Sequence, residues 1–309
     1  MFKTFLSNLH RGYRTARLIQ AEELEKEGFV TASQVLKAGQ VLAAGEDLTV
    51  AAVVGGKLTV AKAGGKDAEV LHPWRDPAPQ GSRVTAVAGT GRHMLAVLDD
   101  GRVVAWGDNS YGLTQVPHGL RAVVIAAGDV MSLAINDDEG KLISWGQIPV
   151  PGSEDLPRLV TVAAGRLRAA GLTPQGEVVV WGWRVSPRYQ PPAGLRAVAL
   201  SVGDDHMLAI DVEGDVVAWG KNAHGQCSVP PALKAVAVAA GSDHSIAITP
   251  SGEVIAWGAN DAGQCRVPAG LRAVAVTGGD GYSVAMTPDG EVVAWGRVEW
   301  PNGRAIPKA

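Results

Sequence analysis

Three histidines in the sequence, His93, His206 and His244, each stand thirteen residues before a Trp-Gly pair. Histidines at one repeated position of a closed fold could converge on a metal ion, for which imidazole nitrogen is a common ligand. The other copies of this position interrupt the set with different residue types, namely Leu48, Met131 (which stands fourteen residues before its Trp), Arg168 and Tyr282. We therefore expect no metal site, and we interpret each histidine as a structural residue that is hydrogen-bonded to a neighbouring loop.

The tripeptide Asp243-His244-Ser245 contains the residue types of a hydrolase triad. Neighbouring side chains of a strand point to opposite sides, whereas a triad needs its base in hydrogen-bond contact with its nucleophile. No base–nucleophile pair with supporting motif residues recurs elsewhere, and no repeat shows the pair of carboxylates expected of a polymer-degrading enzyme. We expect no catalytic site, no enzyme activity and no cofactor.

These residues belong to a repeated unit that ends in Trp-Gly. The pair recurs about every 38 residues, at Trp106, Trp145, Trp181, Trp219, Trp257 and Trp295. Before each pair, two alternating apolar runs joined by a glycine-containing turn predict a β-hairpin, and a short strand precedes it. Residues 41–61 align as a seventh, eroded copy. Because such units must stack and close, the sequence predicts an all-β, seven-bladed β-propeller with short, mostly three-stranded blades and tryptophans in its core.

The predicted propeller covers residues 36–309. It comprises a degenerate first blade at about 41–62, an irregular connector at 62–83, regular repeats at 84–296 and a closing segment at 297–309. The closing segment is similar to a repeat connector, so we expect it to supply the strand before residue 41 and to close the ring. The competing donor of this strand is residues 34–36.

Residues 1–35 differ in composition from the repeats and form a predicted N-terminal helical extension. Phe2, Phe5, Leu6, Leu9 and Tyr13 follow helical spacing. Three interpretations stay open: a helix that covers the propeller, a docking helix that tethers the chain to a larger assembly, and a cleavable organelle presequence. No apolar run has the length of a signal-peptide core or a membrane span. We expect no membrane partner, and a protein that is intracellular or incorporated into an assembled particle.

Charge and cysteine content exclude two further classes. A net charge of −3 lacks the basic excess of a general nucleic-acid-binding protein, so we expect no nucleic-acid partner. The only two cysteines, Cys227 and Cys265, stand 38 residues apart at equivalent repeat positions, which predicts a separation too large for a disulfide.

Two sets of loops should emerge on one face of the propeller, one after the conserved glycine of each repeat and one after each Trp-Gly. Loops on a rigid scaffold are where binding residues concentrate. The candidate partner-binding residues in these loops are Asp108, Asn109, Tyr111, Asp129, Arg166, Trp183, Arg184, Tyr189, Asp204, Asp205, Lys221, Asn222, His224, Asp243, Asn260, Asp261 and Asp280. Because acids dominate and Tyr111, Trp183 and Tyr189 are possible anchors, we expect a protein partner with a basic surface. The alternative is that these charges are only solvated.

The stretch at 241–264, Gly-x-x-His-Ser-Ile-Ala followed by Gly-Glu-Val-Ile-Ala-Trp-Gly-x-Asn and Gly-Gln, resembles the regulator of chromosome condensation repeat family. The resemblance extends over about residues 41–306 and implies a seven-bladed propeller that binds a protein partner. The connector Gly-Gln-Cys-Arg-Val-Pro at 263–268 looks more like the compact bacterial branch, which includes a propeller that inhibits β-lactamases. That relative carries aromatic residues where this chain has acids, so we do not expect β-lactamase inhibition.

The resulting hypothesis is a non-catalytic, protein-binding propeller. It would be a structural or accessory component docked through its N-terminal segment onto a larger, multi-subunit assembly, such as a virion or a surface complex, with one loop face free for a partner. The alternative is a regulator of an enzyme, an inhibitor or a nucleotide-exchange factor, that acts through the same face.

Overall fold

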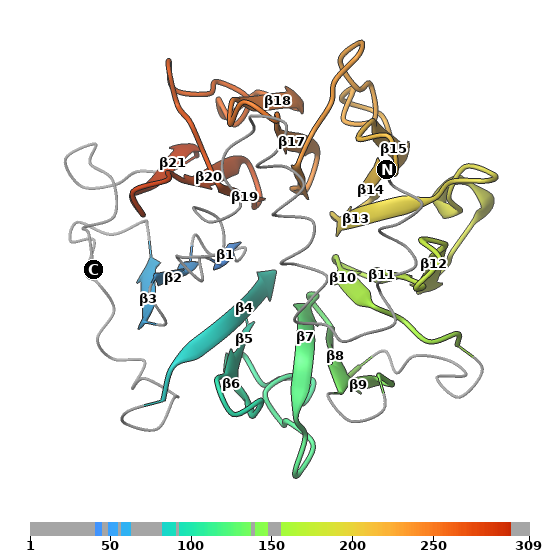
Figure 1. The fold of residues 1–309 in the computed structure, drawn as a ribbon, viewed down its shortest axis with the longest axis vertical. Coiled ribbons are helices and arrows are strands. Elements are labelled where there is room, and N and C mark those ends of the chain that lie inside the picture. The colour runs from blue at the N-terminus through green and yellow to red at the C-terminus, as the bar shows by residue number, and fades with distance from the viewer. Residues whose placement is uncertain are drawn as a thin grey trace.

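The structure is a computed structural model that describes residues 41–44, 49–54, 57–62, 82–90, 93–136, 140–147 and 156–297. These residues form seven sheets, each of three antiparallel strands, arranged side by side in a ring (Figure 1). The predicted all-β, seven-bladed propeller with three-stranded blades is therefore confirmed. Among the residues described, no helix has the length and apolarity needed to cross a membrane.

Each blade runs along the chain from an inner strand through a middle strand to an outer strand. The first four blades are β1 (Val41–Ala44), β2 (Thr49–Val54) and β3 (Lys57–Lys62); β4 (Val84–Thr90), β5 (His93–Leu98) and β6 (Val103–Gly107); β7 (Ala122–Ala127), β8 (Met131–Asn136) and β9 (Leu142–Gly146); and β10 (Thr161–Ala164), β11 (Arg168–Leu172) and β12 (Val178–Gly182). A short 3-10 helix, η2 (Pro187–Tyr189), follows blade 4. Blades 5 to 7 are β13 (Ala197–Val202), β14 (His206–Asp211) and β15 (Val216–Gly220); β16 (Ala237–Ala240), β17 (His244–Ile248) and β18 (Val254–Gly258); and β19 (Ala275–Gly278), β20 (Tyr282–Met286) and β21 (Val292–Gly296).

The middle strand of a blade is buried along its length because a neighbouring blade covers each of its sides. In β17 every residue is buried. Ala247 packs in one cluster with Leu208 and Ile210 of blade 5. Ile246 and Ile248 point to the other side and pack against Ala285 and Trp295 of blade 7. Alternate residues of one strand thus contribute to two different interfaces between blades, and the hydrophobic core lies in those interfaces.

The repeated tryptophans join consecutive blades. The indole Nε1–H of Trp257 donates to the backbone carbonyl of Gln226 at 2.9 Å, and that of Trp295 donates to the carbonyl of Gln264 at 2.8 Å. Each acceptor lies in the connector that follows the preceding blade. The tryptophans are buried, as the sequence predicts, and in Trp145, Trp219, Trp257 and Trp295 the indole N–H also fixes the position of a connector.

The glycine after each tryptophan is required by the same geometry. Gly258 has a φ of 104°, in the region that favours glycine. A Cβ atom at this position would stand 2.8 Å from the carbonyl oxygen of Asp243, which directly precedes the adjacent middle strand. The outer strand can therefore approach the start of the middle strand only where there is no side chain.

The first blade completes the ring. Its inner strand β1 lies beside both β4 of blade 2 and β19 of blade 7. The predicted N-terminal helix, its candidate docking residues Phe2, Phe5, Leu6, Leu9 and Tyr13, and the strand predicted for the closing segment at 298–309 lie outside the residues described. The donor of the strand before residue 41 therefore stays a prediction.

Candidate protein-interaction face

The three repeated histidines bind serines of the next blade. His93 Nε2 lies 2.8 Å from Ser132 Oγ, His206 Nε2 lies 2.9 Å from Ser245 Oγ, and His244 Nε2 lies 2.9 Å from Ser283 Oγ. All six side chains are buried. The hydrogen bonds therefore support the interpretation of the histidines as structural residues. Each partner is a residue of a strand, whereas the sequence predicts a loop.

The partner of each serine determines which histidine nitrogen carries the proton. Ser245 Oγ donates to the carbonyl of Gln226 at 2.8 Å, and Ser283 Oγ donates to that of Gln264 at 2.8 Å. Since a hydroxyl has one proton and a carbonyl only accepts, the histidine must donate from Nε2. Burial lowers the pKa of each of the three histidines from 6.5 to about 4, so the neutral imidazole is the form at neutral pH.

This arrangement does not form a catalytic site. In a hydrolase triad a carboxylate binds Nδ1 and the nucleophile faces substrate. Here Nδ1 of His206 and of His244 is buried without a hydrogen-bond partner, and Ser245 and Ser283 are fully buried. Within the described part of the chain, no three or more His, Cys, Asp or Glu side chains are grouped so that they could hold a metal ion.

The histidine–serine contact can be recognised in the sequence only when two repeat positions are compared together. Each histidine has a serine 39 residues later, at the position after the next copy of its own site. Where Met131 replaces the histidine, the corresponding residue of the next blade is Ala169, and where Arg168 replaces it, the corresponding residue is Met207. Reading the two positions together predicts contacts between blades.

The two loop sets meet at one end of the blades, as the sequence predicts. The backbone N–H of the residue after each Trp-Gly donates to a carbonyl in the loop after the inner strand of the same blade. Examples are Trp183 to Leu167 at 2.9 Å, Lys221 to Asp205 at 2.8 Å and Ala259 to Asp243 at 2.9 Å. We call this end, formed by the loops that carry the candidate residues, the loop face.

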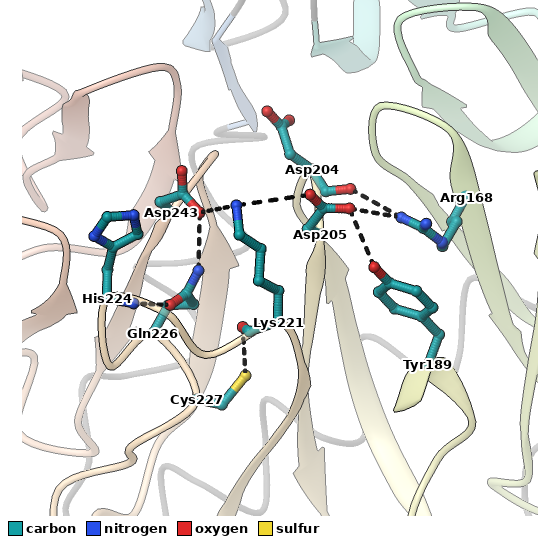
Figure 2. Close-up of polar contacts among 9 residues, drawn as sticks. All are labelled: Arg168, Tyr189, Asp204, Asp205, Lys221, His224, Gln226, Cys227 and Asp243. Carbon is teal, nitrogen blue, oxygen red and sulfur yellow. Dashed lines mark hydrogen bonds and ion pairs between the residues drawn. The ribbon is translucent and has the colours of Figure 1, made fainter. Parts of the chain in front are cut away.

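A chain of charged contacts joins blades 4, 5 and 6 across the loop face (Figure 2). Arg168 Nη1 lies 2.9 Å from Asp205 Oδ1. Lys221 Nζ lies 3.9 Å from Asp205 Oδ2 and 3.4 Å from Asp243 Oδ1. Gln226 Nε2 donates to the same Asp243 oxygen at 2.9 Å. Two candidate acids are thus neutralised by cations of the same molecule.

The prediction that Tyr189 is an exposed anchor is wrong, because its side chain is buried. The Arg168 guanidinium carbon lies 3.6 Å from the centroid of the Tyr189 ring. The Tyr189 hydroxyl donates to Asp205 Oδ1 at 3.3 Å. The Tyr189 backbone carbonyl accepts the indole N–H of Trp219 at 3.0 Å. Tyr189 therefore occupies the place that Gln226 and Gln264 occupy in later blades, a correspondence that the altered connector sequence hides.

Other candidate residues have structural roles in the loops. Asp129 pairs with Arg166 at 3.8 Å, and Asp280 pairs with Arg297 at 3.4 Å. Asp108 accepts the backbone N–H of Ser110 at 2.8 Å. The side-chain oxygens of Asn109, Asn222 and Asn260 accept the backbone N–H groups of Thr114, Cys227 and Cys265. These contacts hold the connectors in shape, and they reduce the acidic character expected of the face.

Two large apolar side chains stay exposed on the loop face. Among the residues described, Tyr111 is 49% exposed and Trp183 is 54% exposed. His224, Asn260 and Asp261 are also exposed, whereas Asp204 is partly buried. Arg184, next to Trp183, has a φ of 48°, which is uncommon for a residue with a side chain.

Comparison with known proteins identifies the repeat. The family model described as regulator of chromosome condensation (RCC1) repeat matches residues 84–113, 197–226 and 235–264. Each matched stretch ends at a connector residue whose carbonyl binds the tryptophan of a following blade, namely Leu113, Gln226 or Gln264. The chain carries RCC1 repeats. Propellers of this kind are generally used in protein interaction and regulation.

Two curated RCC1-type proteins of Arabidopsis thaliana are similar to parts of the chain. The mitochondrial RCC1 domain-containing protein RUG3 is 34% identical over 109 residues, which are 29% of this chain and 24% of RUG3. The ultraviolet-B receptor UVR8 is 28% identical over 182 residues, which are 46% of this chain and 41% of UVR8. The chain therefore spans less than half the length of these relatives.

The fold is similar to that of a solved RCC1 structure. Prp20p of Saccharomyces cerevisiae aligns with a TM-score of 0.59 at 21% identity, over 69% of this chain and 72% of Prp20p. At this identity, the likeness supports the propeller fold.

Proposed function

We propose that this chain is a non-catalytic, protein-binding propeller that engages its partner through the loop face. The observation that carries the proposal is the exposed Trp183 on a loop whose backbone is fixed to the scaffold, with Tyr111 exposed on the same face. Exposed aromatic residues on a rigid base are typical of the anchors of protein interfaces, because their burial contributes much of the binding free energy.

The class of partner is supported by the fold neighbours. Prp20p was described with binding properties to Gsp1p and histones, and another crystal structure holds it bound to Kap60. For this chain we infer from these neighbours only that the partner is a protein. For blades 5 to 7, where Asp261 and Asp280 are exposed, a basic partner surface stays part of the proposal.

Cross-linking with mass spectrometry on the full chain from its native source tests this function. Lys221 lies on the loop face, whereas Lys234 lies at the opposite end, where it pairs with Asp215 at 2.7 Å. Both side chains are exposed enough to react. We expect one partner protein to cross-link to Lys221 and not to Lys234. Cross-links to Lys234 alone would contradict the proposal.

A second candidate function is regulation of an enzyme through the same face. It is favoured because RCC1-like propellers are generally non-catalytic regulators or exchange factors. Charge reversal at Asp204, Asp205 and Asp243 should then abolish the effect on the enzyme that co-purifies with the chain. An unchanged rate of that enzyme with the triple variant would contradict this candidate.

We also propose, from the sequence alone, that residues 1–35 dock the propeller onto a larger assembly. The full chain and a chain that begins at Thr31 should then differ in the large structural partners with which they co-purify. Equal recovery of the same partners by both chains would contradict the docking role, and recovery of a capsid or surface protein by the full chain alone would support the virion or surface version of it.

A further inference from the structure

The loops of blade 4 differ in charge from those of the blades that follow. Residues 165–167 and 183–191 contain three arginines and no acid. These arginines, Arg166, Arg184 and Arg188, are exposed. The corresponding described loops of blades 5 to 7 carry five acids, Asp204, Asp205, Asp243, Asp261 and Asp280, and three cations, Lys221, Arg266 and Arg297. The loop face therefore has a basic part on blade 4, whereas the part beyond it mixes acids with cations that pair with several of them.

The exposed tryptophan lies in the basic part. Trp183 directly follows a Trp-Gly pair, where other repeats hold small or polar residues, such as Asp108, Lys221 and Ala259. Its side chain is 54% exposed, so the propeller core does not explain its presence. A large aromatic side chain with little burial of its own, on a loop that also carries exposed arginines, has the composition of an interface anchor.

The connector that carries Trp183 has a backbone unlike its equivalents. It takes eight residues to pass from Trp181 to Tyr189, whereas seven separate Trp219 from Gln226, which has the same role. The extra residue is accommodated beside Arg184, which adopts a left-handed φ of 48°. Backbone strain of this kind persists where the surrounding structure imposes it, and it is found preferentially at binding sites.

Tyr189, at the end of this connector, is fixed by contacts with blades 4 and 5. Tyr189 packs against Arg168, and both contact the Asp205 carboxylate on blade 5. Arg168 stands where other blades place the histidine that binds a serine. Blade 4 has thus replaced the usual contact between blades with one that fixes the end of the Trp183 loop (Figure 2). A loop ordered before binding loses less conformational entropy when a partner binds.

We propose that the blade-4 patch, consisting of Arg166, Trp183, Arg184 and Arg188, binds an acidic segment of a protein partner. Guanidinium groups bind carboxylates in a bidentate way, and Trp183 would cover an apolar side chain beside those carboxylates. Arg184 and Arg188 form no ion pair with any described residue, so they are available for this contact. The inference rests on the proposed function, because it names the chemistry of the partner of the same face.

The charge around the patch favours an acidic protein segment over a nucleic acid. Asp129 lies beside Arg166, and Asp205 lies behind the connector. A nucleic acid carries a phosphate at every nucleotide, so part of its charge would meet these acids. A protein segment can place its carboxylates at the arginines alone.

The test uses the full chain and a fluorescein-labelled 12-residue peptide of alternating Asp and Glu with one central Phe. Binding is measured by fluorescence anisotropy at low and physiological salt, beside the same peptide with Lys in place of the acids and a 12-nucleotide oligo-dT. The variants are Trp183→Ala and Arg184→Glu/Arg188→Glu. The matched control is Arg196→Glu at the other end of the same connector, where Arg196 pairs with Glu177. All altered side chains are exposed, and thermal unfolding confirms that each variant is folded.

We expect the acidic peptide to bind the wild-type chain, and each patch variant to weaken that binding at least about tenfold. Arg196→Glu should leave the affinity within about twofold. The inference is overturned if the peptide does not bind, if the patch variants bind as wild type, or if only oligo-dT binds. It is also overturned if the full chain is a dimer that the patch variants convert to a monomer, because a second copy would then occupy the patch.

The same variants separate this inference from the proposed function. If the native partner still cross-links to Lys221 while Arg184→Glu/Arg188→Glu binds it as tightly as wild type, the loop face binds a partner but the acidic-segment inference is wrong. If no protein cross-links to the loop face, the proposed function itself is wrong, whatever the peptide does.

Discussion

At the scale of single residues, His93, His206 and His244 are the groups of the described part of the chain whose pKa falls well below its ordinary value. Burial holds the pKa of His93, His206 and His244 at about 4, against 6.5 in the unfolded chain. Between these values the unfolded chain binds more protons than the folded one. The contribution of these histidines to the unfolding free energy is therefore fully present above pH 6.5, and it is lost as the pH falls toward 4.

This predicts an unfolding free energy that falls steeply between pH 6.5 and 4. A variant that copies the Met131 and Ala169 pair into the interface between blades 5 and 6, His206→Met with Ser245→Ala, should show a shallower slope, by up to about 1.4 kcal/mol per pH unit. Urea unfolding at several pH values measures both slopes. Equal slopes would mean that His206 titrates alike in the folded and unfolded states. Carboxylates near these histidines, such as Asp108 and Asp243, are present in both chains and largely cancel in the comparison.

A residue-scale test also separates strain from binding. Arg184→Gly removes a cation of the blade-4 patch and, at the same time, the unfavourable left-handed conformation of a residue with a side chain. We expect an unfolding free energy unchanged or raised by up to about 1 kcal/mol, with weaker binding of the acidic peptide. A destabilised variant with full binding would show that Arg184 serves only the fold.

At the scale of elements, the outer strands of blades 2 to 7 end in a glycine on which they depend. Gly258→Ala would place a Cβ 2.8 Å from the Asp243 carbonyl at a positive φ, so we expect a loss of about 2–4 kcal/mol. Gly270 also has a positive φ, of 74°, but no heavy atom lies within 4 Å of the place that a Cβ would take. Gly270→Ala should therefore cost about 1 kcal/mol, the backbone strain alone. Denaturant unfolding measures both variants, and equal losses would contradict the close approach of strands at Gly258.

The Trp183 connector should loosen when its ion pair is removed. Arg168 is mostly buried, whereas Asp205 is 38% exposed, so Asp205→Ala should cost about 1–3 kcal/mol rather than the full value of a buried pair. Asp280→Ala, which breaks the exposed pair with Arg297, should stay within about 0.5 kcal/mol. Hydrogen exchange of residues 183–189 should rise in the first variant only. No change in that exchange would mean that Asp205 does not hold the connector.

The elements themselves were predictable because each repeat gives the same hydrophobic pattern. Trp-Gly marks the outer strand, and the stretch that begins thirteen residues earlier, such as His244–Ile248, forms the middle strand, which is buried on both sides. The loop roles were less predictable, because they depend on contacts between blades. Tyr189 looks like an exposed anchor in the sequence, yet it lies under Arg168, and Asp243 looks like a free acid, yet it binds Lys221 and Gln226.

At the scale of the whole molecule, the propeller brings loops of successive repeats onto one face and gives that face its uneven distribution of charge. Arg166, Arg184 and Arg188 are separated in sequence from Asp243, Asp261 and Asp280, and only the ring places the two groups on a common surface. The RCC1 repeat explains the ring, while the departures from the repeat in blade 4 supply the candidate binding residues.

The measurement that tests the central claim most directly compares two variants of the full chain for binding to the partner that co-purifies with it. One variant alters the loop face by Tyr111→Ala, Trp183→Ala and Asp243→Lys. The other alters the opposite end of the blades, where turns join the middle and outer strands, by Asp99→Ala, Glu213→Ala and Asp289→Lys. We predict that the first loses at least about tenfold in affinity while the second binds as wild type. Loss of binding by the turn variant, with the loop-face variant unaffected, would contradict the assignment of the loop face as the binding surface.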